Sequence, residues 1–231
     1  LLFSQDVIHG FCTMFPVPLA EASAWEPELT QRTAHATAVE ATANGVHWTF
    51  APMIDITRDP RWGRVVEGSG EDPFLGSAMA TARIKGFHGD GPTSTAFMLT
   101  TAKHFVAYGA AEAGRDYNTV DLSQRTLWEV YLPPFQAAVQ ASVDAIMPAF
   151  NELDGLPMAS NQALLDGVLR RRWGFSGMIV SDHDALSELI THGIAATPLD
   201  ASRQAIGAGL EVEMANQFFR QNLPYLVRNG E

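Results

Sequence analysis

The stretch VLRRRWGFSGMIVSDHD, residues 168–184, decides the fold of this chain. A cationic helical segment ends at Gly174, and the short apolar run 178–180 that follows terminates in Ser181 and Asp182. An apolar run of this length after a glycine is typical of a strand buried on both faces in a parallel α/β sheet. In a barrel, the carboxyl end of such a strand carries the chemistry. We therefore predict that Asp182 lies at a catalytic rim.

Short apolar segments alternate with longer helical ones along the whole chain. The candidate strands are residues 1–3, 46–50, 98–102, 145–147, 178–180 and 210–214. The candidate helices are residues 28–43, 75–87, 121–141, 161–173, 200–208 and 218–228. This alternation is typical of βαβ units and a parallel sheet. We predict an α/β fold, a (β/α)8 TIM-type barrel that is incomplete over residues 1–231, with a doubly wound open sheet as the alternative.

Two helices carry specific local signals. Residues 28–43 place one group of apolar side chains at helical spacing, namely Leu29, Ala36, Val39 and Ala43. In the other helix, Asp121 and Gln124 resemble a capping box, and the pair Pro133-Pro134 should interrupt the helical hydrogen bonding.

Composition limits the partners. The chain has 231 residues, 46% of them hydrophobic, and a formal net charge of −11. The negative charge disfavours nucleic acid or an anionic membrane as a partner, and a neutral or small polar ligand is the easier match. No apolar run approaches the roughly 20 residues that span a bilayer. Because the chain opens at Leu1 in an apolar segment, we expect it to be an excerpt of a longer protein whose other parts complete the barrel.

Polar side chains follow several of the predicted strands. Asp6 follows the first, Lys103 and His104 follow the third, Asp182 follows the fifth, and Arg64 lies in the long loop after the second. Convergence of acids, bases and an arginine at one rim suits a polyhydroxylated ligand, because carboxylates accept from hydroxyl groups while Arg and Lys donate to them. Three further acids are expected to be turn or capping residues: Asp55, Asp59 and Asp154.

Six sequence blocks in order resemble glycoside hydrolase family 3, and the closest subgroup resembles the bacterial periplasmic β-glucosidases. The blocks are DVIHG at 6–10, RDPRWGR at 58–64, GEDP at 70–73, AKHF at 102–105, GRDYN at 114–118 and GMIVSD at 177–182. The resemblance implies a retaining, exo-acting enzyme that releases terminal β-D-glucose through a covalent glycosyl-aspartate and uses no cofactor. It also implies a periplasmic or secreted location.

The resemblance assigns a role to each candidate. Asp182 would be the nucleophile, Asp6 would bind the outer hydroxyl groups of the sugar, and Arg64, Lys103 and His104 would bind the others. The substrate would be a β-linked oligosaccharide or glycoside. The acid/base would be a glutamate in a downstream domain of the same chain, placed about 5–5.5 Å from the nucleophile. We expect the cations Lys103 and Arg64 to lower the pKa of Asp182.

The chain departs from the family pattern at three places and leaves other functions open. His183 stands where a tryptophan is usual, Phe150 where a tyrosine is usual, and Glu-Val-Glu at 211–213 replaces an Asp-x-Asp pair. A β-xylosidase of the same family and a non-catalytic sugar-binding barrel are therefore alternatives. A metal-dependent hydrolase is another alternative, with Asp6, His9 and residues 182–184 as the ligands.

Overall fold

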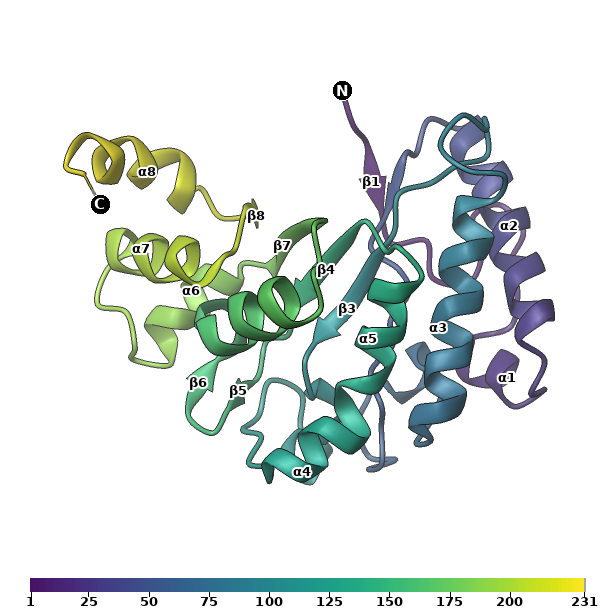
Figure 1. Cartoon of the computed structure of the whole chain (residues 1–231), viewed down its shortest axis with the longest axis horizontal. Helices are drawn as coiled ribbons and strands as arrows, with labels where there is room; N and C mark the ends of the chain where they lie inside the picture. The colour runs from purple at the N-terminus through teal and green to yellow at the C-terminus, as the bar shows by residue number, and fades with distance from the viewer. Residues whose placement is uncertain (231) are drawn as a thin grey trace.

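A computed structural model describes residues 1–230. Within them, six parallel strands form an open arc, which runs in Figure 1 from β1, near the N-terminus, through β3, β4 and β7 to β8, near α8. These strands are β1 (Ser4–Gln5), β2 (Trp48–Thr49), β3 (Thr101–Phe105), β4 (Ala145–Pro148), β7 (Met178–His183) and β8 (Val212–Met214). Two short strands, β5 (Glu152–Leu153) and β6 (Leu156–Pro157), form a separate antiparallel hairpin that the sequence did not predict.

Helices connect the strands and pack along the arc (Figure 1). The longer ones are α2 (Pro27–Ala43), α3 (Pro73–His88), α5 (Pro133–Gln140), η6 (Ala163–Arg172), α6 (Ala185–Thr191), α7 (Pro198–Ala208) and α8 (Phe218–Arg228). The short ones are α1 (Pro18–Ala22), η1 (Val65–Glu67), η2 (Tyr108–Ala110), η3 (Glu112–Gly114), α4 (Gln124–Thr126), η4 (Leu127–Tyr131) and η5 (Met158–Ser160). Several begin at a proline, whose fixed φ suits the first helical position and whose missing N–H is not needed there.

The strand order distinguishes between the two predicted architectures. β1 pairs with β2, a parallel bridge joins Trp48 of β2 to Leu99 just before β3, and the sheet then runs β3-β4-β7-β8. Apart from the β5–β6 hairpin, each strand lies beside the next one in the chain, and the order never reverses. A doubly wound sheet needs such a reversal, whereas a (β/α)8 barrel does not. The arc therefore has barrel-type order, although no barrel closes within residues 1–230.

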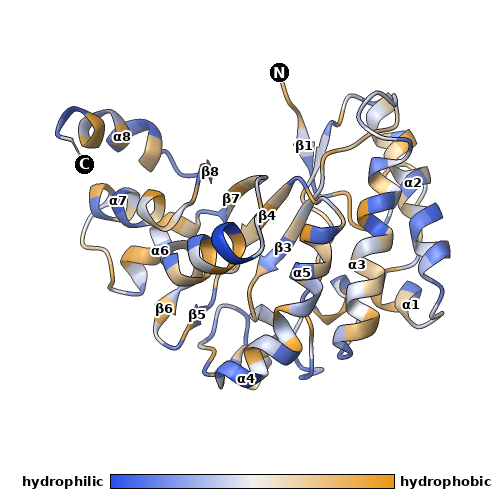
Figure 2. Ribbon diagram, in the orientation of Figure 1, coloured by the Kyte–Doolittle hydropathy of each residue, from blue (hydrophilic) through white to orange (hydrophobic). Residues whose placement is uncertain are grey.

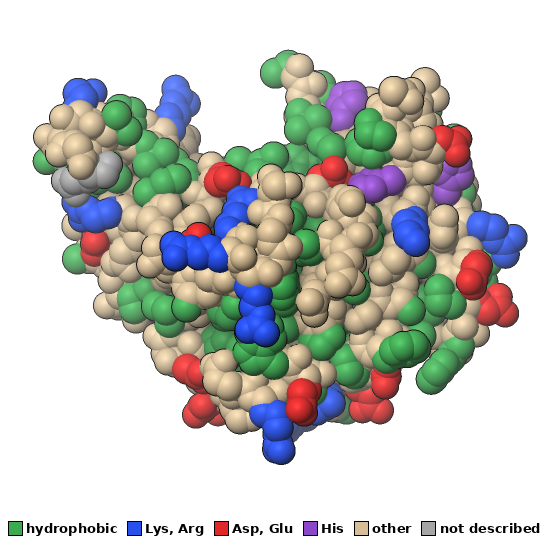
Figure 3. All heavy atoms as spheres, viewed as in Figure 1, with side chains coloured by type: hydrophobic (Ala, Val, Ile, Leu, Met, Phe, Trp, Pro, Cys, Tyr) green, Lys and Arg blue, Asp and Glu red, His purple; other side chains and the backbone are tan. Residues whose placement is uncertain are grey.

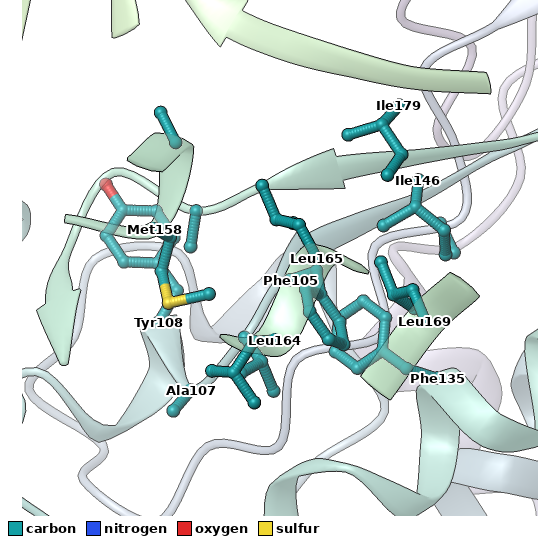
Figure 4. Close-up of a cluster of buried hydrophobic side chains, with 14 of the residues drawn as sticks. Phe105, Ala107, Tyr108, Phe135, Ile146, Met158, Leu164, Leu165, Leu169 and Ile179 are labelled. Carbon is teal, nitrogen blue, oxygen red and sulfur yellow. The ribbon is translucent and has the colours of Figure 1, made fainter. Parts of the chain in front are cut away.

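The core divides into two layers because side chains alternate across each strand. Ile146 and Ile179 are fully buried against helices, together with Phe105, Phe135 and Leu169, as Figure 4 shows. The neighbouring strand positions form a second layer on the inner face of the arc. That layer contains the buried residues Trp48, Ala145, Met147 and Val180. Figure 2 shows the resulting hydrophobic band along β4 and β7.

Two strand boundaries differ from the predictions in a way that matters for the site. β3 spans Thr101–Phe105 rather than residues 98–102, so Lys103 and His104 lie within the strand and not after it. β7 continues to His183, so Asp182 is also a strand residue. The predicted strand at residues 1–3 is shifted to Ser4–Gln5, because these two residues are the ones that pair with Trp48 and Thr49 of β2.

The helix at residues 28–43 is confirmed, but its predicted buried face is wrong. Val39 is 46% exposed, and the buried side chains are instead Thr30, Ala34, Thr37, Ala38 and Ala41. These small side chains face α3, where a Cβ at Gly86 would collide with the backbone of Gln31. Close helix contact through small residues has replaced the expected packing of larger apolar side chains.

The predicted capping box at Asp121 is also wrong. The hydroxyl of Ser123 accepts from the backbone N–H of Thr126, so Ser123 is the N-cap of α4. The interruption at the proline pair is confirmed, because η4 ends at Tyr131 and α5 begins at Pro133. In residues 1–230 we find no helix that is long and apolar enough to cross a membrane.

The molecular surface is hollowed between the N-terminal segment and α8, with hydrophobic side chains along the floor (Figure 3). A cavity of about 660 Å³ lies at the amino-terminal ends of the strands, where Leu99, Asp144, Gly177 and Glu211 each precede or begin a strand. The carboxyl ends of the strands, where Lys103, His104 and Asp182 lie, do not line this cavity. The two ends of the arc are therefore distinct surfaces.

A buried ion pair ties the segment after β1 to the helices. Arg83 of α3 donates to Glu21 of α1 over 2.6 Å, and both side chains are less than one-tenth exposed. Arg83 also donates to the carbonyl oxygen of Ile8 over 3.0 Å. Because Ile8 is only two residues from Asp6, the ion pair holds the segment that carries one of the predicted site residues.

We expect Arg83→Met to destabilise the full-length protein by about 3–5 kcal/mol, because it leaves the Glu21 carboxylate buried without a partner. Arg61→Met, which removes an exposed arginine paired with Asp59, should cost less than about 1 kcal/mol. Denaturant unfolding would measure both. Removing both buried charges in Arg83→Met/Glu21→Gln should recover part of the loss, and equal stability of the two single variants would contradict this interpretation.

Candidate active site

Asp182 lies near the carboxyl end of β7, with its side chain 14% exposed. Its Oδ1 accepts from the backbone N–H of His183 over 2.7 Å. Its Oδ2 is buried and has no hydrogen-bond partner, and it lies 3.5 Å from Nε2 of His104. One carboxylate oxygen is therefore anchored, while the other faces the rim without a donor.

His104 is the centre of the site. It is fully buried on β3, and its Nε2 lies 3.1 Å from Nη2 of Arg64. On the opposite side of the ring, Nδ1 lies 2.8 Å from Oδ2 of Asp55, which also accepts from the backbone N–H of His104 over 2.9 Å. Burial, followed by the charges of Arg64 and Lys103, lowers the pKa of His104 well below its usual value. His104 is therefore neutral at physiological pH.

Arg64 enters the site from the long loop after β2. Its Nε donates to Oε1 of Glu67 over 2.7 Å, and its Nη2 donates to Oε2 of Glu67 over 3.0 Å. The guanidinium also lies over the ring of Tyr108, 5.6 Å from its centroid. Burial alone disfavours the charge, but the hydrogen bonds and charge of Glu67 raise the pKa of Arg64 above its usual value. The cation is thus held rigidly against His104.

Lys103 and Asp6 form the other charged pair of the rim. Lys103 lies one residue before His104 in β3, and its side chain is 6% exposed. Its Nζ donates to Oδ1 of Asp6 over 2.6 Å, whereas the Asp6 side chain is 59% exposed. The pair places a buried cation behind a solvent-facing carboxylate, an arrangement that can donate to and accept from hydroxyl groups of a ligand. Figure 2 shows the hydrophilic tip of β3, the strand that contains Lys103 and His104.

The structure brings all five predicted residues to one rim. Arg64, His104 and Asp182 are joined by direct contacts, and Lys103 is paired with Asp6. The charges of Lys103 and Asp6 also act on the pKa of Asp182. The set therefore forms one electrostatic unit.

Asp55 is a site residue that the sequence interpretation missed. It was expected to be a turn or capping acid, yet it is 2% exposed and holds His104. Its position between Ile54 and Ile56, in an otherwise apolar run, was the available signal, because a buried acid requires a partner. For Asp59 the expectation of a turn residue is confirmed, because its Oδ1 accepts from the backbone N–H of Arg61.

The expected direction of the Asp182 pKa is also wrong. Burial is the largest influence and raises the pKa of Asp182 above its usual value. The hydrogen bond from His183 and the charges of Lys103 and Arg64 lower it, as expected, but they only partly offset the burial. A partly desolvated carboxylate is less stabilised in its charged form than one in water.

Aromatic rings form a wall beside Arg64 and His104. The ring of Tyr108 contacts those of Trp62, His104 and Phe150 at centroid distances of 5.0, 5.2 and 6.0 Å. Phe150 in turn packs against Tyr117 at 5.0 Å. Phe150, one of the departures from the family pattern, therefore fills an apolar position in this wall.

The arrangement does not support the alternative of a metal site. Among residues 1–230, no three His, Cys, Asp or Glu side chains are placed to hold a metal ion. His183 has a side chain that is 69% exposed and lies 3.5 Å from Asp184, while Nδ1 of His9 lies 2.8 Å from the carbonyl oxygen of Phe15. The proposed ligands therefore do not converge.

Comparison with known proteins identifies the family of this chain. Over residues 1–231 the sequence matches the family described as Glycosyl hydrolase family 3 N terminal domain. The chain belongs to glycoside hydrolase family 3. The resemblance carried by the six sequence blocks is thus confirmed.

Individual relatives are similar over nearly the whole chain. The chain is 45% identical to a periplasmic beta-glucosidase of Salmonella typhimurium over 100% of this chain and 30% of that protein. It is 41% identical to a beta-xylosidase of Formosa agariphila, over 89% of this chain and 29% of that protein. The structure of a beta-glucosidase from Listeria innocua in complex with isofagomine matches with a TM-score of 0.98 and 45% identity, over 100% of this chain and 33% of that one.

These similarities confirm the TIM-type α/β architecture that the sequence predicted, without a closed barrel in the part that the structure describes. The chain spans about a third of the length of the relatives that it matches. Its residues correspond to one portion of each of those proteins.

The buried Asp55 generates a pH prediction. Burial raises the pKa of Asp55 to about 7. Between the ordinary pKa of an aspartate, about 4, and this value, folding takes up a proton, so the contribution of Asp55 to the free energy of unfolding is full below about pH 4 and is lost as the pH rises to about 7.

Asp55→Asn should remove this dependence. Relative to the variant, the parent should lose about 2–3 kcal/mol of unfolding free energy between pH 5 and pH 8. Asp59→Asn is the matched control: hydrogen bonds from Arg61 lower the pKa of Asp59 to about 2, so its contribution changes only below about pH 4. Denaturant unfolding at several pH values would measure both, and parallel curves for parent and Asp55→Asn would contradict the assignment.

Proposed function

We propose that the full-length protein is a retaining, exo-acting β-glucosidase in which Asp182 is the nucleophile. The observation that carries the proposal is the environment of the Asp182 carboxylate at the carboxyl end of a barrel-type strand. Its Oδ1 is held by a hydrogen bond, whereas its Oδ2 is buried and has no hydrogen-bond partner. A retaining glycosidase requires a carboxylate oxygen that is free to bond to the anomeric carbon. The named relatives, a periplasmic beta-glucosidase and a Listeria innocua beta-glucosidase, support the choice of reaction.

The remaining rim residues are suited to holding the sugar. Asp6 presents a largely exposed carboxylate that can accept from two hydroxyl groups, with Lys103 behind it as a donor. His104 and Arg64 offer nitrogen atoms beside Asp182. The cations Lys103 and Arg64 also favour the ionised form of Asp182, which attack requires, against the penalty of its burial.

In this proposal, attack by Oδ2 of Asp182 on the anomeric carbon breaks the glycosidic bond and forms a glycosyl ester. The leaving group takes a proton from an acid, and water then hydrolyses the ester with the same group acting as base. Asp6 and Asp55 are committed to Lys103 and His104, respectively. As the resemblance to the family implies, we assign the acid/base to a further part of the full-length protein, and the roughly threefold greater length of the relatives is consistent with such a part.

The substrate class and the location of the enzyme are part of the proposal. We propose β-linked glucosides or oligosaccharides as substrates, and a periplasmic or secreted location by analogy with the periplasmic relative. A β-xylosidase is the second candidate, because a relative named as one is 41% identical. The ratio of kcat/KM for aryl β-glucoside and aryl β-xyloside would decide between them.

The first test concerns the nucleophile in the full-length protein. Asp182→Asn keeps the size of the side chain but removes its charge, and turnover should fall by several orders of magnitude with the fold intact. Asp184→Asn, two residues away and with a side chain 52% exposed, is the matched control and should keep most of the activity. Mass spectrometry after reaction with an activated fluorinated glucoside should find the sugar on Asp182. The reverse pattern of activities would show that the wrong carboxylate was chosen.

The second test concerns sugar binding. Lys103→Ala and His104→Ala should each weaken transition-state binding by about 2–4 kcal/mol, because Lys103 supports Asp6 and the charge of Asp182, and His104 contacts Arg64 at the rim. The loss should be visible in both kcat and KM. Lys85→Ala and His192→Ala remove exposed residues of the same types and serve as controls. Unchanged kinetics in the Lys103 and His104 variants would show that neither residue contributes to sugar binding.

A further inference from the structure

We propose that Asp55 is a positioning residue that fixes the tautomer of His104 and thereby keeps the attacking oxygen of Asp182 free of a hydrogen-bond donor. The inference rests on the proposed role of Asp182 as nucleophile. It concerns a residue that would not touch the substrate, because Asp55 is buried on the far side of the His104 ring from Asp182.

The contact between Asp55 and His104 determines what Nδ1 must do. Oδ2 of Asp55 accepts from the backbone N–H of His104 over 2.9 Å, so this oxygen serves as an acceptor. The same oxygen lies 2.8 Å from Nδ1 of the ring. An acceptor at this distance requires a proton on Nδ1. A proton on Asp55 would reside on Oδ1, which has no partner, and would leave the Oδ2 contact unchanged.

Arg64 imposes the complementary requirement on Nε2. A guanidinium has only donors and stays protonated in proteins, so a nitrogen 3.1 Å from Nη2 of Arg64 must offer a lone pair. Glu67 holds Arg64 in place through two hydrogen bonds. Because His104 is neutral, its single ring proton is on Nδ1, and Nε2 carries none. The two contacts select the same tautomer independently.

The consequence falls on Asp182. Its Oδ2 lies 3.5 Å from Nε2 of His104, close enough for a small movement to form a hydrogen bond if Nε2 carried a proton. Such a bond would stabilise the carboxylate before attack and would have to be broken as the oxygen bonds to carbon. An interaction present only in the ground state slows the reaction. With the proton held on Nδ1 by Asp55, His104 cannot make it.

A double-mutant cycle in the full-length enzyme tests the proposal. The readout is the rate at which an activated 2-fluoroglucoside labels Asp182, which isolates the attack step. Asp55→Leu should slow labelling about 10- to 100-fold when His104 is present, because an orienting partner of a histidine has been removed. In a His104→Ala background the same substitution should change the rate less than about threefold, because the two residues act as a unit.

Two further variants separate positioning from general damage. Asp55→Asn keeps an oxygen that can accept from both His104 donors, so it should recover at least about tenfold of the rate lost in Asp55→Leu. Asp59→Leu, an acid of the same loop with no contact to His104, should label at the parental rate. An equal loss from Asp55→Leu in both His104 backgrounds, or no recovery in Asp55→Asn, would overturn the proposal.

A direct observation complements the kinetics and needs no variant to fold. Neutron diffraction from crystals of the deuterated parent enzyme should find the deuteron of His104 on Nδ1, facing Asp55. A deuteron on Nε2 would refute the proposal even if the kinetics agreed. If the parent enzyme is not labelled on Asp182 at all, the proposed function fails, while the neutron map still decides the tautomer. The two failures are therefore distinguishable.

Discussion

Every feature of the rim depends on the need to pair charges that the barrel-type strands bury. Lys103 and His104 lie inside β3, and Asp182 lies inside β7, so their side chains cannot be satisfied by water alone. The chain brings Asp6, Asp55 and Arg64 from earlier segments to meet them. Because Glu67 holds Arg64 and the backbone N–H of His104 holds Asp55, the geometry of the site follows from this pairing more than from the strands themselves.

The sequence predicted the fold better than the packing within it. Alternating apolar and helical segments indicated a parallel barrel-type sheet, because such periodicity survives whatever the side chains contact. The buried face of α2 could not be predicted in the same way. Val39 is the larger apolar residue, but the small residues Ala34 and Ala38 face α3, since the close approach at Gly86 favours small side chains. Local pattern does not reveal which neighbour a helix will meet.

Site residues could be predicted where they stood in a specific motif. They could not be predicted where their role or pKa depended on which segments of the fold surround them. Lys103, His104 and Asp182 were found because they end or interrupt apolar runs. Asp55 was taken for a turn residue because acids are common in loops, and only the fold shows that its loop passes behind His104. The direction of the pKa shift of Asp182 was predicted wrongly for the same reason. Nearby cations can be inferred from the motif, whereas the burial of the carboxylate cannot.

The ion pair of Lys103 and Asp6 joins residues separated by 97 positions in the chain. Closing so large a loop carries an entropic cost that is recovered only when the long-range contact forms, and topologies rich in such contacts fold slowly. During synthesis, β1 leaves the ribosome long before β3, and β7 emerges later still. β1 can pair with β2 early, but the outer edge of β2 stays open until the segment around Leu99 and β3 emerges, and such an open edge is prone to aggregation until the later strands cover it.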